Sequence, residues 1–240
     1  MIEMLFAGAA GALPCLFFAA VATLIVGGII WAIISARKRR EEYERLAAEL
    51  GCQYYPDDPW DLPARYAHFD LFSTGHGRKA ANVLAGGLDG RSALAFDYQY
   101  STGSGKNETT HHFQVAVLEM PITAPALKLR DESFLDTIAS WVGHDDIDFE
   151  SAEFSKRYHV KCTERKFAYD IFHARLIEYL LACGNAPGME FRGPLVVLNQ
   201  TLGGPEQARR LLEIGREIVR SIPEYVLHER GMAAKAGGQQ

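Results

Sequence analysis

The chain has 240 residues, of which 48% are hydrophobic and 23% charged, with a formal net charge of −5 at pH 7. This composition is typical of a globular protein and excludes a disordered, collagen-like or disulfide-rich secreted chain. The mild acidity argues against a dedicated nucleic-acid-binding protein, because such domains are usually basic. The four cysteines form no close CxxC pair, which argues against a zinc ribbon.

The N-terminal segment carries the strongest signal in the chain. Every residue from 4 to 34 is uncharged, and all are apolar or small except Thr23. A helix rises about 1.5 Å per residue, so about 20 residues cross the hydrocarbon core of a bilayer. The stretch Leu16–Ile34 alone is long enough. We therefore predict that residues 14–34 contact the lipid bilayer as a single transmembrane helix.

The charges on either side of this segment predict its orientation. The basic cluster Arg37–Arg40 follows the span, whereas Glu3 is the charge before it. The positive-inside rule then places the N-terminus outside and the C-terminal domain in the cytoplasm. A cleaved signal peptide would instead carry its basic residues ahead of a shorter apolar core. Within the span, Ala19, Thr23 and Gly27 form a small-residue face that is a candidate homodimer contact, or simply a span rich in small residues.

The rest of the sequence is predicted to form one soluble domain. We assign residues 1–35 to the N-terminal tail and transmembrane helix, 36–230 to a cytoplasmic domain and 231–240 to a flexible tail. A helix over residues 40–50, ended by Gly51, leads from the membrane into this domain. Strands with short connections follow, so we expect an α+β fold with an antiparallel β-meander and flanking helices.

The meander is predicted from three alternating segments. Strands over residues 80–88 and 91–100 flank Asp89-Gly90, a dipeptide that is typical of two-residue hairpin turns. A third strand covers residues 109–119, and residues 127–130 extend the same sheet. In the second half, helices are expected over residues 131–143, 167–183 and 204–221. Strands are expected over residues 144–150 and 158–162, and a small hairpin is expected to join residues 189–191 to residues 195–198.

The glycine-rich loop Ser101–Asn107 (STGSGKN) contains GSGK and invites comparison with a phosphate-binding loop. A Walker A motif requires G-x-x-x-x-G-K-[ST] before a helix, but Tyr100 replaces its first glycine and Asn107 its hydroxyl residue. A hairpin loop is therefore favoured, with a looser anion site at Lys106 and the glycine N–H groups as the alternative. Nearby tyrosines either recognise a ligand or pack across strands. The candidate ligand-binding residues are Gly103, Gly105, Lys106, Tyr98 and Tyr100.

Histidines on the third strand are the candidate catalytic residues. His111 and His112 are adjacent, so their side chains point to opposite faces of a strand and cannot share one metal ion. Either histidine is a candidate general base that would act together with Asp97. No nucleophile motif such as G-x-S-x-G occurs in the sequence. Surface or cross-strand packing is the alternative interpretation. The acidic run 144–150 lacks the pattern of a calcium loop, and we predict neither a metal site nor a cofactor.

Part of the domain resembles a known group of bacterial proteins. The stretch Asn82–Leu118 resembles members that share the pattern NVL…G…FDY.Y.TGSGK…T…VA, and residues 146–158 (DIDFESAEFSKRY) resemble the same group. These proteins look like single-span membrane proteins with a cytoplasmic domain of unknown function. The resemblance implies a bacterial inner membrane as the location and implies no activity, substrate or catalytic residue.

Two functions follow from these observations. The first is a membrane-anchored, cytoplasm-facing binding or regulatory module, whose partner is an unknown protein or small molecule and not a nucleic acid. It is favoured because no complete catalytic motif occurs in the sequence. The alternative is a membrane-associated, hydrolase-like enzyme that uses His111 or His112 in a pocket next to the loop Ser101–Asn107.

Overall fold

The computed structural model describes residues 3–131 and 146–231, with side chains described from Val21 onward. The chain divides into two compact units, Met1–Glu42 and Tyr43–Gln240. Helix α1 (Glu3–Leu50) begins in the first unit and ends in the second. The expected helix of residues 131–143 and most of the expected tail lie outside the described residues.

The first unit is the apolar part of α1. Among the described residues, Val21–Leu50 belongs to one helix near the N-terminus that is long and apolar enough to cross a membrane, as the sequence predicts. Its large apolar side chains are exposed, with Leu24 at 76% and Trp31 at 72%. Such a surface is costly in water but is the normal surface of a helix in lipid, where the helix satisfies its own backbone hydrogen bonds.

The last turns of α1 belong to the second unit. Tyr43, Leu46 and Ala47 are buried there, at the helical spacing that the sequence shows. The helix ends before Gly51, whose φ of +66° is the left-handed conformation that glycine adopts at low cost. The predicted helix over residues 40–50 is therefore part of α1.

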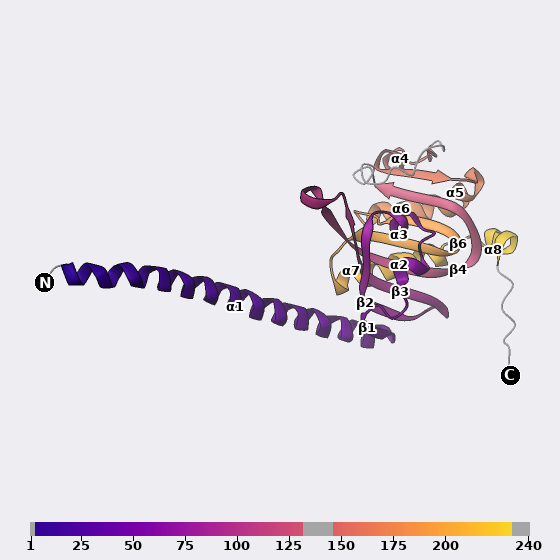
Figure 1. Ribbon diagram of the computed structural model, residues 1–240. Helices are drawn as coiled ribbons and strands as arrows, with labels where there is room; N and C mark the ends of the chain where they lie inside the picture. Colours follow the sequence, from indigo (N-terminus) through magenta and orange to yellow (C-terminus); the bar gives the residue numbers. More distant parts are fainter. Residues whose placement is uncertain (1–2, 132–145, 232–240) are drawn as a thin grey trace. The chain divides into compact units, whose positions relative to one another are not determined.

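The second unit is built on a six-stranded antiparallel sheet in the order β1-β2-β3-β4-β5, with β6 paired to β4 (Figure 1). Asp89 and Gly90 join β2 to β3 and have φ angles of +51° and +77°, which fits a type I′ hairpin turn. This α+β architecture is the predicted fold class. The strands are β1 (Gln53–Asp57), β2 (His76–Leu88), β3 (Arg91–Thr102), β4 (Thr109–Asp131), β5 (Tyr158–Cys162) and β6 (Gly188–Thr201).

Strand β4 is long and organises the sheet. Its first half pairs with β3, its second half with β5, and β6 pairs with both halves. The predicted small hairpin across Gly193-Pro194 is therefore wrong, because both of its arms belong to the single strand β6. Register shifts between Glu119 and Leu127 and a φ of +57° at Gly193 allow the paired strands to bend without ending.

Helices cover both faces of the sheet (Figure 1). The helices of the second unit are α2 (Leu62–Arg65), α3 (Asp70–Ser73), the 3-10 turn η1 (Gly105–Asn107), α4 (Ala152–Arg157), α5 (Arg165–Ile171), α6 (Ala174–Ala182), α7 (Pro205–Arg220) and α8 (Glu224–Arg230). Side chains of α5, α6 and α7 join Tyr43 in the larger core cluster, and those of α2 and α3 pack with strand residues in the smaller one.

Two further expectations need correction. The predicted helix over residues 167–183 is two helices, because α5 ends before Phe172 and His173 starts α6 by accepting a hydrogen bond from the Leu176 N–H at 3.4 Å. The predicted strand over residues 144–150 is wrong for its described part, where Ile147 makes one backbone bond to Val160 at 2.9 Å outside regular structure. Helix α7 agrees with its prediction.

Candidate functional site

The sheet separates the residues that the sequence grouped together. Successive side chains of a strand alternate between faces, so Asp97 and Gln114 face the larger core cluster, whereas Tyr98 and Tyr100 belong to the smaller one. Tyr98 is buried and its hydroxyl donates to the carbonyl of Leu71 at 3.2 Å. Of the predicted ligand-binding residues, the two tyrosines therefore lie beneath helices α2 and α3.

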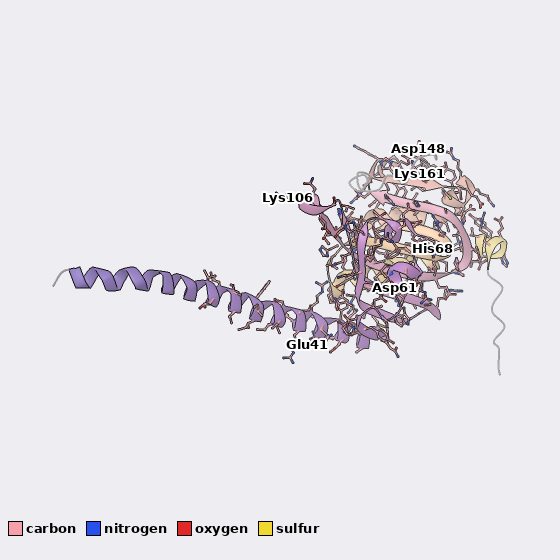
Figure 2. All side chains as sticks on the ribbon, in the orientation of Figure 1. Glu41, Asp61, His68, Lys106, Asp148 and Lys161 are labelled. Atoms are coloured by element: carbon pink, nitrogen blue, oxygen red, sulfur yellow. The ribbon has the colours of Figure 1, made fainter. Side chains whose placement is uncertain are left out.

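The loop Ser101–Asn107 is a hairpin connection with η1 inside it. Lys106 is exposed and lies at the outer end of this hairpin (Figure 2). At Gly103, where φ is +78°, an added Cβ would lie 2.3 Å from the carbonyl oxygen of Asn107. Gly105 has a φ of +60° and open space around it. The glycines are thus explained by the geometry of the turn.

The two histidines point to opposite faces, as predicted. His111 pairs with Tyr100 across the strands, stacks on its ring at 5.0 Å between centroids, and lies 2.9 Å from the Thr102 hydroxyl through Nε2. Asp97 lies on the face opposite His111 and accepts hydrogen bonds from Tyr43 at 2.5 Å and from an asparagine, Asn82, at 2.7 Å. The structure therefore does not bring Asp97 and His111 together.

His112 shares a face with Asp97 but is exposed, two pairs further along the strands. Within residues 3–131 and 146–231, no three histidine, cysteine or carboxylate side chains are grouped so that they can hold a metal ion. The predicted catalytic candidates thus occupy three separate environments: a packed ring against Tyr100, an exposed ring, and a carboxylate bound to Tyr43.

A cavity of about 40 Å³ lies on the face of the smaller core cluster, and we call it the polar cavity. Its volume accommodates a few water molecules or one small polar group. Tyr100 from β3 and Leu71 from α3 contribute to its wall, and β4 and β6 supply the rest. The remaining lining residues are Phe113, Lys128, Arg130, Asp131, Gly188, Met189, Glu190, Val197 and Asn199.

Charged side chains form a linked group at this cavity. Lys128 and Glu190 are direct cross-strand partners, with Nζ and Oε1 3.9 Å apart. Lys128 also forms an ion pair with Asp70, the first residue of α3, and Arg130 lies 3.7 Å from the same carboxylate. The backbone N–H of Asp70 donates to Glu190 at 3.0 Å. These side chains are at most 15% exposed, so the site holds charge at a substantial desolvation cost.

Burial changes the protonation behaviour of the group. It raises the pKa of the Glu190 carboxyl above its ordinary value, although Lys128 acts in the opposite direction. Burial also lowers the pKa of the Arg130 guanidinium, which Asp70 partly offsets. Perturbed titratable groups around a cavity are typical of functional sites, because binding and proton transfer require them.

Tyr100 supplies an unsatisfied polar atom to the polar cavity. The residue is 1% exposed, and its hydroxyl makes no hydrogen bond to any described part of the protein. Burial raises the pKa of this hydroxyl, so it stays protonated and able to donate. Buried hydroxyl groups nearly always have a partner, so an acceptor from beyond the described residues fits this position.

Sequence reasoning selected Tyr100 but missed Asp70, Lys128, Arg130 and Glu190. The available signal was the alternation of Lys128 and Arg130 with buried leucines, which places two charges on one covered face of a strand. Glu190 lies 120 residues after Asp70, so no local pattern connects them.

Comparison with known proteins gives one fold similarity. A scan of protein-family models finds no match, and a search of curated proteins finds none. The structure is similar to the crystal structure of the mycobacterial trehalose monomycolate transport factor A, TtfA, with a TM-score of 0.55. The two chains are 15% identical, and the match covers 78% of this chain and 97% of that chain. At this identity the likeness shows the shared α+β fold.

Proposed function

We propose that this protein is a membrane-anchored accessory factor that assists the transport of an envelope lipid by binding a partner or ligand. The observation that carries the proposal is the fold similarity to a factor of trehalose monomycolate transport, which extends over 97% of that chain. Two proteins with one fold can differ in function, so the ligand of this chain is assigned from its own site.

The anchor supports this function. Helix α1 is continuous from its exposed apolar part to Leu50, and the side chains of Tyr43 and Leu46 are buried in the domain. Regular helix therefore runs from the apolar segment into the domain. The basic cluster Arg37–Arg40 and the resemblance of residues 82–118 to single-span bacterial proteins support a cytoplasmic domain at the inner membrane. Self-association through Ala19, Thr23 and Gly27 stays a prediction.

The polar cavity supports binding as the mode of action. Its paired charges and the hydroxyl of Tyr100, which has no hydrogen-bond partner among the described residues, suit recognition of a small polar group, such as one end of a partner side chain or a ligand headgroup. Catalysis through His111 receives no such support, because its ring nitrogen faces Thr102 and Asp97 lies across the sheet.

The proposal is tested in the bacterium that encodes the chain. The gene is deleted, inner and outer envelope fractions are separated, and extractable lipids are quantified in each. We expect one amphiphilic lipid to accumulate in the inner membrane, and the full chain expressed from a plasmid to restore its distribution. An unchanged lipid distribution between the fractions would refute a role in transport.

A further inference from the structure

A second cavity, of about 280 Å³, lies between the β2–β3 hairpin, β4 and helices α7 and α8. We call it the arginine groove, and none of the polar-cavity residues lines it. Its volume is just below the range of about 300–1,000 Å³ that is typical of small-molecule sites. It is therefore large enough for a compact organic ligand, unlike the polar cavity.

Several residues that line the arginine groove are apolar. Leu118 of β4 is buried and packs against Gly215 of α7, where an added Cβ would lie 2.5 Å from a leucine methyl group. This close approach fixes α7 against the sheet. Leu88, Val219 and Leu227 are only partly buried and line the groove. The wall thus offers apolar surface that a ligand chain would cover.

The lining also includes three guanidinium groups and two carboxylates. Arg220 holds Asp89 through two hydrogen bonds, of 2.8 Å from Nε and 3.0 Å from Nη2. Glu119 accepts a hydrogen bond from the backbone N–H of Ser92 at 3.3 Å. Arg91 is the third lining arginine, so the groove has one more positive than negative group. Both carboxylates already have partners, and the excess positive charge faces the groove.

Arg216 is the least satisfied of these groups. Its Nε is shielded from solvent, lies 4.0 Å from the Asp89 carboxylate and makes no hydrogen bond to the described parts of the chain. The Arg216 side chain as a whole is 37% exposed, so the rest of its guanidinium is accessible, and an oxyanion is the partner that a guanidinium prefers. This guanidinium and the apolar side chains line the same groove.

We propose that the arginine groove binds an anionic amphiphile, with its phosphate or carboxylate group at Arg216 and Arg91 and its single apolar chain against Val219 and Leu227. The excess positive charge favours the anionic group of the ligand, and the partly buried leucine and valine side chains favour its apolar chain. This assignment names a ligand class and a site that the proposed accessory function does not require.

The experiment uses the full chain in nanodiscs of zwitterionic phosphatidylcholine, titrated calorimetrically with octyl phosphate below its micellar concentration. Empty nanodiscs supply the baseline. We expect saturable binding of one octyl phosphate, and at least tenfold weaker binding of octanol and of inorganic phosphate. Equal binding of octanol would overturn the anionic part of the proposal. Equal binding of inorganic phosphate would overturn the apolar part, and absence of saturable binding would overturn both.

Variants locate the binding. Arg216→Gln is expected to weaken octyl phosphate binding at least tenfold, whereas Arg209→Gln, on the same helix but outside the groove, leaves it unchanged. Val219→Trp fills the groove and is expected to abolish binding, with Leu227→Trp as a second blocking variant if the first is unfolded in its thermal melt. Binding that survives the folded blocking variant, or that falls equally in both arginine variants, would overturn the assignment. Because no transport is measured, failure here leaves the accessory-factor proposal intact.

Discussion

The hydroxyl of Tyr43 donates a hydrogen bond to Asp97 at 2.5 Å, across 54 residues of sequence. Tyr43 lies on the last turns of the anchor helix and Asp97 in the middle of β3. The second carboxylate oxygen accepts from Asn82, whose side-chain oxygen accepts in turn from Tyr54 at 2.7 Å. A partly buried polar network therefore fixes the end of the anchor helix to the sheet.

The first prediction concerns this network. Tyr43→Phe leaves the half-buried Asp97 carboxylate with one donor fewer, so we expect the free energy of unfolding to fall by about 1–3 kcal/mol. Thermal and denaturant unfolding of the full chain in detergent measure the change. Tyr55→Phe is the control, since its hydroxyl bonds to Gln53 at the surface. Equal stability of the Tyr43 variant and the native chain would contradict the account.

The second prediction separates two glycines of the hairpin loop. Ala at either position is strained by about 1–2 kcal/mol, because φ is positive at both. Gly103→Ala also forces Cβ against the Asn107 carbonyl, whereas Gly105→Ala meets open space. We therefore expect the first variant to lose more unfolding free energy than the second, measured by denaturant titration. A Gly105 variant as unstable as the Gly103 variant would show that the close contact is unimportant.

The third prediction compares two buried tyrosines on one strand. Tyr100→Phe removes a hydroxyl with no hydrogen bond to the described chain, so we expect the stability of the ligand-free protein to change by less than about 0.5 kcal/mol. Tyr98→Phe removes a bond to the Leu71 carbonyl and should cost about 1 kcal/mol. Thermal melts of both variants test the difference. A larger loss at Tyr100 would mean that its hydroxyl stabilises the fold and is not held for an external group.

The fourth prediction concerns the pH dependence of stability. Burial raises the folded-state pKa of Glu190 above the ordinary value of 4.5, so the folded protein keeps this proton at a pH where the unfolded chain has lost it. The free energy of unfolding should therefore fall as pH rises from about 4.5 through the raised folded-state pKa.

Glu190→Gln removes this titration but keeps an oxygen that can accept from the Asp70 N–H. Unfolding of both proteins is measured over the acidic range. We expect the stability of the native chain relative to the Gln variant to decrease with rising pH and then level off. A constant difference at every pH would contradict the raised pKa of Glu190.

Local chemistry explains which parts of the fold are predictable. Asp89-Gly90 requires only two positive φ angles, and helix α7 needs only its own apolar stripe after Gly204-Pro205, so both follow from short segments. The hairpin predicted around Gly193-Pro194 fails because the same residues also suit a bend within one strand. Pairing with β4 decides between these structures, and that pairing is not a local property.

Sequence patterns could not predict the polar cavity either, because strand pairing brings its residues together. Asp70 and Lys128 are 58 residues apart, and Glu190 joins them because β6 pairs with β4. Asp97 and His111 were grouped by their nearness along one hairpin, but the alternation of strand residues places them on opposite faces. Nearness along the chain therefore predicted a contact that does not form, and a large separation hid one that does.

The most direct test of the account asks whether the domain must be anchored to act in lipid transport. In the deletion strain, the full chain is compared with residues 37–240 expressed without an anchor and with the same residues joined to an unrelated single-span helix. Immunoblots of the soluble and membrane fractions establish that the three proteins are present in equal amounts. We expect both anchored forms to restore the lipid distribution and the detached domain to leave it unrestored. Full restoration by the detached domain would contradict this expectation.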